Sequence, residues 1–180
     1  MGIDVARTAK GALAGAVAAA AWAAQQPLDK RVFDSDYDDV ELLGKLVTRG
    51  SGWQAAGWAL HLQNGAMFGA TYAALAPLVP VPAVARGIAA AMAENFGLWP
   101  LGRLSDRYHP ARGELPRLTG NRRALAQATW RHFLFGVLLG ELERRLNRDR
   151  DDVVFDFEAV ASTNGHGRLS DAVPAGRLSG

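Results

Sequence analysis

Four ionisable side chains lie within apolar stretches of this sequence, where an unpaired charge is costly. Glu94 lies in RGIAAAMAENFGLWPLGR, His61 lies in HLQNGAMFG, and Arg131 and His132 lie together in ATWRHFLFG. Glu94 and Arg131 carry opposite formal charges, so the sequence predicts that they pair. A carboxylate and two imidazoles at one place could also accept a proton or bind an ion or a ligand.

The spacing predicts that these side chains form one polar layer. His61 and His132 each begin the pattern His-x3-Gly-x3-Gly, which places each imidazole on the helix stripe that meets another helix. His61, Glu94 and His132 each lie eight residues into their stretch. Helices that alternate in direction would therefore bring them to a similar depth. The expected layer consists of Glu94, Arg131, His61, His132, Asn64 and Asn95.

Two interpretations of this layer stay open, a structural one that fixes helix register and a functional one that binds a proton, ion or ligand. A metal is not predicted, because the Glu-x-x-His pattern of di-metal bundles is missing and Arg131 would repel a cation. FDSDYDDVELLGK begins with the spacing of a calcium loop, but Asp39 takes the glycine position and Lys45 the glutamate position. An acidic surface turn is expected there instead.

Composition and known motifs narrow the function classes. The chain has 180 residues, with 20 Lys and Arg against 18 Asp and Glu, a balance that does not indicate nucleic-acid binding. Without cysteine there is no disulfide and no thiol chemistry. Phosphate-binding, dinucleotide and hydrolase motifs are missing as well. No cofactor and no enzymatic activity are predicted.

Four alanine-rich stretches without period-two alternation predict an all-α fold. The expected helices cover about 9–26, 53–78, 84–103 and 121–148, each close to the ~20 residues that cross a bilayer. Pro27 is expected to end the first helix, and VELLGKLV to form a short helix capped by Asp38 or Asp39. Residues 1–150 are predicted as the helical domain and 151–180 as a largely disordered tail.

Small residues favour a membrane bundle over a water-soluble one. Glycine within a soluble helix costs roughly 1 kcal/mol relative to alanine, whereas Gly-x3-Gly lets membrane helices pack closely. The sequence therefore predicts a four-helix transmembrane bundle of up-down topology, and the repeated histidine pattern suggests two pseudo-repeated helical hairpins. The expected packing positions are Gly11, Gly15, Gly65, Gly69, Gly87, Gly136 and Gly140.

The order of several short motifs resembles the YagU-type small bacterial inner-membrane proteins. GALAG opens the first helix, which closes on Pro-Leu, and His61 leads to Phe68-Gly-Ala-Thr-Tyr72. Trp-Pro-Leu-Gly starts at Trp99, and the helix with His132 closes on Glu-Arg-Arg-x-Leu. The resemblance covers about 11–148 and implies a small multi-helix protein of the bacterial inner membrane, without catalytic residues to carry over. Glu94, Arg131 and the long first linker depart from that family.

Three functions follow from this interpretation. The first is an inner-membrane protein whose polar layer does proton- or solute-linked work or belongs to an envelope stress response. The second is a membrane scaffold with a purely structural polar layer, and the third is a soluble α-helical bundle that binds an apolar ligand. The expected partner is the lipid bilayer. The sequence is also compatible with a homo-oligomer or with other membrane proteins as partners.

Overall fold

The computed structural model describes residues 4–148 and confirms an all-α fold over that range. Residues 4–146 lie within one compact unit. The predicted tail at 151–180 lies outside the described residues. The elements are α1 (Val5–Phe33), α2 (Asp39–Val47), α3 (Trp53–Leu75), the 3-10 turn η1 (Ala76–Leu78), α4 (Ala83–Leu98), the 3-10 turn η2 (Trp99–Leu101), α5 (Gly102–Tyr108) and α6 (Arg122–Leu146).

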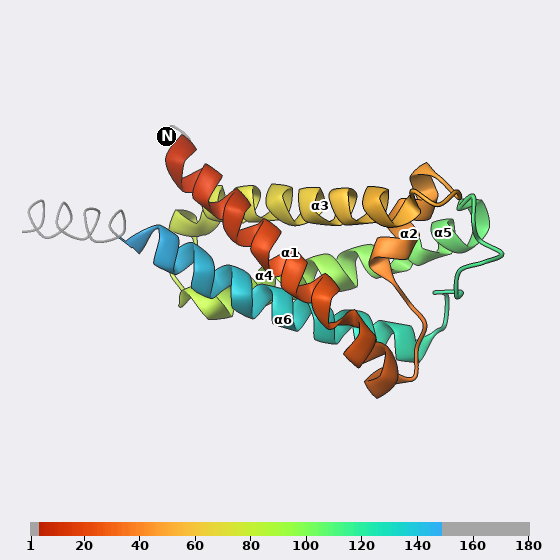
Figure 1. Ribbon diagram of the computed structural model, residues 1–180. Helices are drawn as coiled ribbons and strands as arrows, with labels where there is room; N and C mark the ends of the chain where they lie inside the picture. Colours follow the sequence, from red (N-terminus) through yellow and green to blue (C-terminus); the bar gives the residue numbers. More distant parts are fainter. Residues whose placement is uncertain (1–3, 149–180) are drawn as a thin grey trace, which may run out of the picture. The chain divides into compact units, whose positions relative to one another are not determined.

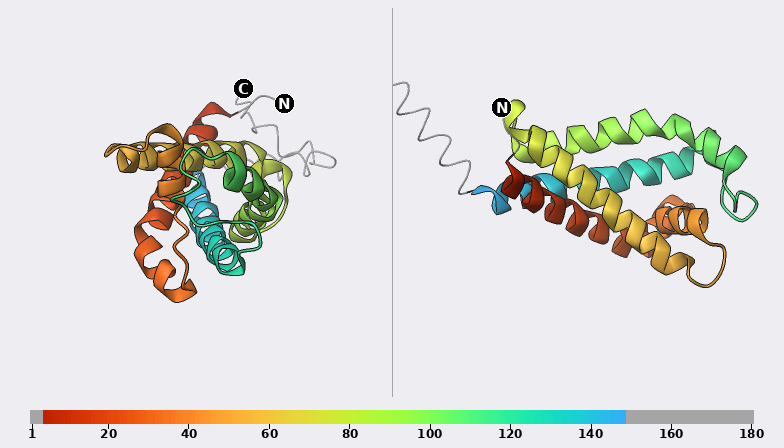
Figure 2. Two further views of the ribbon diagram at one scale, coloured as in Figure 1. Left: turned by 90° about the vertical axis from the view of Figure 1, so that its right-hand side faces the viewer. Right: turned by 90° about the horizontal axis from the view of Figure 1, so that it is seen from above.

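The four long helices α1, α3, α4 and α6 alternate in direction, as the sequence predicts (Figure 1). α1 packs against α3 and α6, and α4 packs against α6. α3 and α4 are joined through η1 and diverge from that end toward α2 and α5 (Figure 2). These two helices therefore pack mainly on α1 and α6 and not on each other, which leaves space between them.

Glycines form the tight crossings of the long helices, α1 with α3 and α4 with α6. A Cβ atom added to Gly15 would lie 2.0 Å from the carbonyl oxygen of Gly65, and one added to Gly87 would lie 2.3 Å from that of Gly136. Such distances leave no room for a side chain, so the backbones touch directly. The predicted packing role is confirmed at α1–α3 and at α4–α6. The remaining predicted glycines, Gly11, Gly69 and Gly140, lie at the same crossings.

The expected end of the first helix at Pro27 is wrong, because α1 continues to Phe33. A proline removes one hydrogen bond from a helix, but here the following turn carries Asp29, which is held by two hydrogen bonds from Arg131. The helix ends instead at Asp34, in the left-handed conformation with φ 47°. Tertiary contacts thus override a local stop signal and place Asp29 inside the protein.

The predicted short helix is confirmed as α2, and Asp38 is its N-cap. The Asp38 carboxylate accepts a hydrogen bond from the backbone N–H of Glu41 at 2.9 Å and one from Lys30 Nζ at 2.6 Å. α2 lies against α3, where Gly44 and Gly57 permit close contact. The cap therefore fixes where the chain turns back from α1 onto α3.

Asp38→Ala should lower the free energy of unfolding by about 1 kcal/mol, because it leaves a helix N–H without its partner. Thermal unfolding followed by circular dichroism measures this loss. Asp36→Ala removes the same charge from an exposed position in the same loop and serves as the control. Equal stability of the two variants would contradict a capping role for Asp38.

Mean hydropathy does not support the predicted membrane spans. Within residues 4–148, no helix combines the length and the mean hydropathy expected of a helix that crosses a bilayer. Four of the eight buried residues of the main core are alanines, and the other four are Trp22, Tyr72, Phe135 and Leu139. Where glycines and alanines face each other, the helix backbones come into contact.

Candidate functional site

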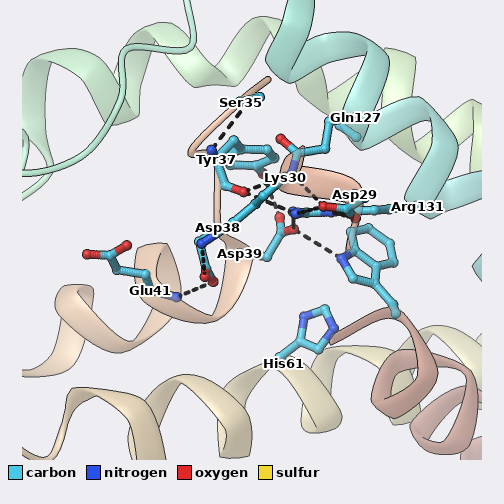
Figure 3. Close-up of polar contacts among 12 residues, drawn as sticks. Asp29, Lys30, Ser35, Tyr37, Asp38, Asp39, Glu41, His61, Gln127 and Arg131 are labelled. Carbon is cyan, nitrogen blue, oxygen red and sulfur yellow. Dashed lines mark hydrogen bonds and ion pairs between the residues drawn. The ribbon is translucent and has the colours of Figure 1, made fainter. Parts of the chain in front are cut away.

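Arg131 is the centre of a buried ionic network that joins α6 to the end of α1 and the start of α2 (Figure 3). Its Nε and Nη2 atoms donate to the two carboxylate oxygens of Asp29 at 2.6 and 2.7 Å, and Nη1 donates to Asp39 at 2.7 Å. The Arg131 side chain is fully buried. The predicted pairing with Glu94 is therefore wrong, because Asp29 and Asp39 already occupy the guanidinium.

Asp39 binds three different donors. Besides Arg131, it accepts hydrogen bonds from Trp22 Nε1 at 3.1 Å and from the Tyr37 hydroxyl at 2.6 Å. Burial raises the pKa of the Asp39 carboxyl, but Arg131 and the Tyr37 hydroxyl outweigh it, so that its pKa lies below the usual value. Burial and the adjacent carboxylate raise the pKa of Tyr37. Asp39 is thus an ionised carboxylate held inside the fold.

The expected acidic surface turn is wrong for this residue. Asp34 pairs with Arg123 at the surface and Asp38 caps α2, but Asp39 enters the network. Gln127 completes it by donating to Asp29 at 2.6 Å and to the Tyr37 carbonyl at 3.2 Å. These contacts hold the loop between α1 and α2 against the N-terminal half of α6.

A cavity of about 320 Å³ lies next to this network. α2 and α5 border its end, and α3, α4 and α6 form much of its wall. Its apolar lining includes Trp22, Phe68 and Phe135. Arg131 does not line it, although its partner Asp39 does. The structure therefore brings together five of the six predicted site residues, namely Glu94, His61, His132, Asn64 and Asn95.

Both histidines pack edge-to-face against Trp22. Its ring centroid is 5.3 Å from that of His61 and 4.6 Å from that of His132. His61 Nε2 lies 3.1 Å from the carbonyl oxygen of Ala19, and His132 Nδ1 lies 2.8 Å from that of Ala128. Because a carbonyl oxygen only accepts, these two nitrogens carry the protons. In the neutral rings, His61 Nδ1 and His132 Nε2 are then acceptors.

The histidines also limit the predicted pseudo-repeat. His61 reaches across to the partner helix of its hairpin, whereas His132 bonds to its own helix. The two hairpins are therefore equivalent at their glycine crossings but differ at their histidines.

Glu94 contributes a further acceptor to the cavity. Its Oε2 atom lies 3.8 Å from His132 Nε2, and its side chain is 35% exposed. This separation is too long for a hydrogen bond, and within residues 4–148 no donor lies within bonding distance of the carboxylate. The neighbouring Asn95 uses its amide N–H to donate to Thr129 at 3.0 Å. Glu94 is consequently an acceptor in the cavity that no protein donor in the described part of the chain binds.

Comparison with known proteins adds no assignment. The chain matches no family model, no curated protein and no solved structure. In the part of the chain that the structure describes, no three His, Cys, Asp or Glu side chains are grouped so as to hold a metal ion. The ligand chemistry of the cavity is therefore indicated only by the side chains that line it.

A second buried ion pair joins the opposite ends of α1 and α6. Arg7 Nη2 lies 2.7 Å from Glu143 Oε1, and the Glu143 side chain is fully buried. Arg86 lies near the same carboxylate at 3.8 Å and donates to the Tyr72 hydroxyl at 3.2 Å. α1 and α6 are thus joined by one buried ion pair near each of their ends.

The sequence interpretation missed the residues that bind Arg131. It looked for a counter-charge only inside the apolar stretches, whereas Asp29 and Asp39 lie just beyond the first one. The sequence did carry one signal for them. A buried guanidinium can bind more than one carboxylate, so the aspartates close to the apolar stretches were candidate partners. Trp22, Tyr37 and Gln127 gave no comparable signal.

Proposed function

We propose that this protein is an integral membrane protein that binds a small hydrogen-bond donor in the cavity beside Glu94. Two features support the proposal. The outward faces of the long helices lack charge, and the cavity between the helices holds a carboxylate, Glu94, that no protein donor within residues 4–148 binds.

The outward faces carry the argument for the bilayer. Exposed residues are uncharged on α1 between Lys10 and Lys30, on α6 between Arg123 and Arg144, and along all of α3 and α4. A helix of a water-exposed bundle carries charged residues on its outer face. Large exposed side chains on these faces include Leu13, Val17, Trp58, Met67, Phe96, Trp130 and Phe133.

Three charged residues of α1 and α6 that lie between these bounds face inward. Asp29, Arg131 and Glu143 are at most 1% exposed. Polar groups inside and apolar groups outside are the distribution expected when lipid is the solvent. Mean hydropathy averages over both faces of a helix, whereas only the outward face would contact lipid. The resemblance to the YagU-type proteins supports the bacterial inner membrane as the location.

The unmatched acceptors carry the argument for binding. The Glu94 carboxylate is 35% exposed and lines the cavity, so a bound donor or cation can reach it and pair with its charge. Ligand sites commonly combine an apolar wall with a few convergent polar groups, and this cavity has both. Binding of a solute fits this arrangement better than a purely structural layer, in which the acceptors would be matched within the protein.

Cysteine labelling tests both halves of the proposal, because the chain has no cysteine of its own. Asn64 and Met67 are exposed residues one helical turn apart on α3, and only Asn64 lines the cavity. In membrane vesicles, a small cationic thiol reagent should modify Asn64→Cys and the loop variant Ser51→Cys. It should not modify Met67→Cys, because lipid would cover that side chain.

A charge comparison completes the experiment. A cationic thiol reagent should modify Asn64→Cys faster than an anionic reagent of the same size, and Glu94→Gln should remove that preference. Ser51→Cys gives the intrinsic ratio of the two reagents. Rapid modification of Met67→Cys would contradict the membrane location. An unreactive Asn64→Cys in folded protein would contradict a solute-binding cavity.

A further inference from the structure

We propose that the ligand of this cavity is an amphiphile with a primary ammonium head, and that its apolar chain lies in the groove between α3 and α4. This inference rests on the proposed function and adds the chemical class of the ligand. It follows from a second cavity that opens beside the first.

The groove between α3 and α4 continues the first cavity. It encloses about 410 Å³, and Phe68 and Glu94 line both spaces. The rest of its lining is mainly apolar and includes Leu75, Ala76 and Ala90. Glu94 therefore lies where the first cavity, with its several polar side chains, meets an apolar groove, which is a position suited to the head of an amphiphile.

The head is identified by the acceptors around Glu94. The Glu94 Oε2 atom lies 3.8 Å from His132 Nε2. The carboxylate oxygen is an acceptor, and so is Nε2 when the imidazole is neutral, because Nδ1 then carries the proton. A primary ammonium has three N–H donors and one positive charge, so it can bind both atoms and compensate the carboxylate. A quaternary ammonium supplies the charge without the donors.

An anionic head is disfavoured because the nearby guanidinium groups are already bound. Arg86 lines the groove, but its Nη1 donates to the carbonyl oxygens of Ala76 and Val79 at 2.9 and 3.0 Å. Its Nε donates to the Tyr72 hydroxyl. Arg131 is held by Asp29 and Asp39, away from the cavity wall.

The groove reaches the outer surface of the bundle. Thr71, Leu75 and Val79 line it and are exposed. The exposed residues of α3 and α4 are uncharged. An apolar chain could therefore enter sideways from a bilayer, without passing the ionic network near α2.

Photocrosslinking with an alkylamine tests the inference. The full chain is placed in phosphatidylcholine nanodiscs with a photoactivatable analogue of dodecylamine, and the labelled peptides are identified by mass spectrometry. Label is expected in α3 and α4 around Leu75 and Ala90. Dodecylamine should compete at concentrations at least about tenfold lower than butylamine, dodecanoate or dodecyltrimethylammonium.

Two variants separate the head from the chain. Glu94→Gln should remove the preference for dodecylamine over dodecanoate. Ala90→Phe fills the groove and should make dodecylamine no better than butylamine. Ala89→Phe adds the same ring to the exposed neighbouring position, which does not line the groove, and should leave the preference unchanged.

The wild-type competition alone decides the main outcomes. Equal competition by butylamine and dodecylamine would overturn the groove but retain the solute-binding cavity. Equal competition by dodecanoate would overturn the ammonium head. If no amine protects the protein and Asn64→Cys is also unreactive, both the inference and the proposed function are wrong.

Discussion

Arg131→Met is expected to destabilise the fold by roughly 3–5 kcal/mol, the range for breaking a buried ion pair by removing one partner. It would leave the carboxylates of Asp29 and Asp39 inside the protein without their cation. Thermal or denaturant unfolding in detergent, followed by circular dichroism, measures the loss. Arg144→Gln removes an exposed guanidinium from the same helix and should cost far less.

Compensating changes should recover much of this loss. In the triple variant Arg131→Met, Asp29→Asn and Asp39→Asn, each new amide keeps one acceptor oxygen, which can accept from Gln127 at position 29 and from Trp22 or Tyr37 at position 39. Neutral replacement of a whole buried ionic cluster is often tolerated. If Arg131→Met alone is as stable as Arg144→Gln, the network does not hold α1, α2 and α6 together.

Gly15→Ala should have the second largest effect, a loss of about 3 kcal/mol at the upper end of the range for overpacking. The added Cβ would lie 2.0 Å from the carbonyl oxygen of Gly65, a backbone atom that cannot move alone. α1 and α3 would have to separate along their whole crossing. The same unfolding measurement applies, and loss of the near-ultraviolet signal of Trp22 would report the loosened core.

Gly97→Ala is the matched control for this prediction. It makes the same substitution in a long helix, at a position where a Cβ meets nothing within 4 Å. Alanine is the better helix former, so this variant should gain about 0.5–1 kcal/mol. A loss of stability in Gly15→Ala together with a gain in Gly97→Ala would show that helix contact, not helix propensity, decides the effect at Gly15. A change of the same sign in both variants would contradict this explanation.

Local patterns predicted the helices and their crossings well. The glycine spacing places small residues on one stripe of each helix, and contact along that stripe depends on little else. The shared depth of His61, Glu94 and His132 followed from counting residues in helices that alternate in direction. These features need only helix geometry, which a sequence carries directly.

The partners of Arg131 could not be obtained in the same way. They depend on α1 continuing past Pro27 and on α2 turning back toward the bundle, and neither follows from residue spacing. At Pro27 the local preference to stop competes with a long-range ion pair, and the ion pair prevails. The rule that a buried charge needs a partner correctly predicted that Arg131 binds a carboxylate. Which carboxylate binds it depends on the topology of the chain.

The reciprocal charges of α1 and α6 have a consequence for biogenesis. Arg7 pairs with Glu143 and Asp29 pairs with Arg131, which lies 102 residues later in the chain. While the ribosome is still making the middle of the protein, the first helix carries two charges whose counter-ions do not yet exist. Until α6 is made, α1 therefore carries two charges without their partners, and its final packing depends on the last helix of the fold.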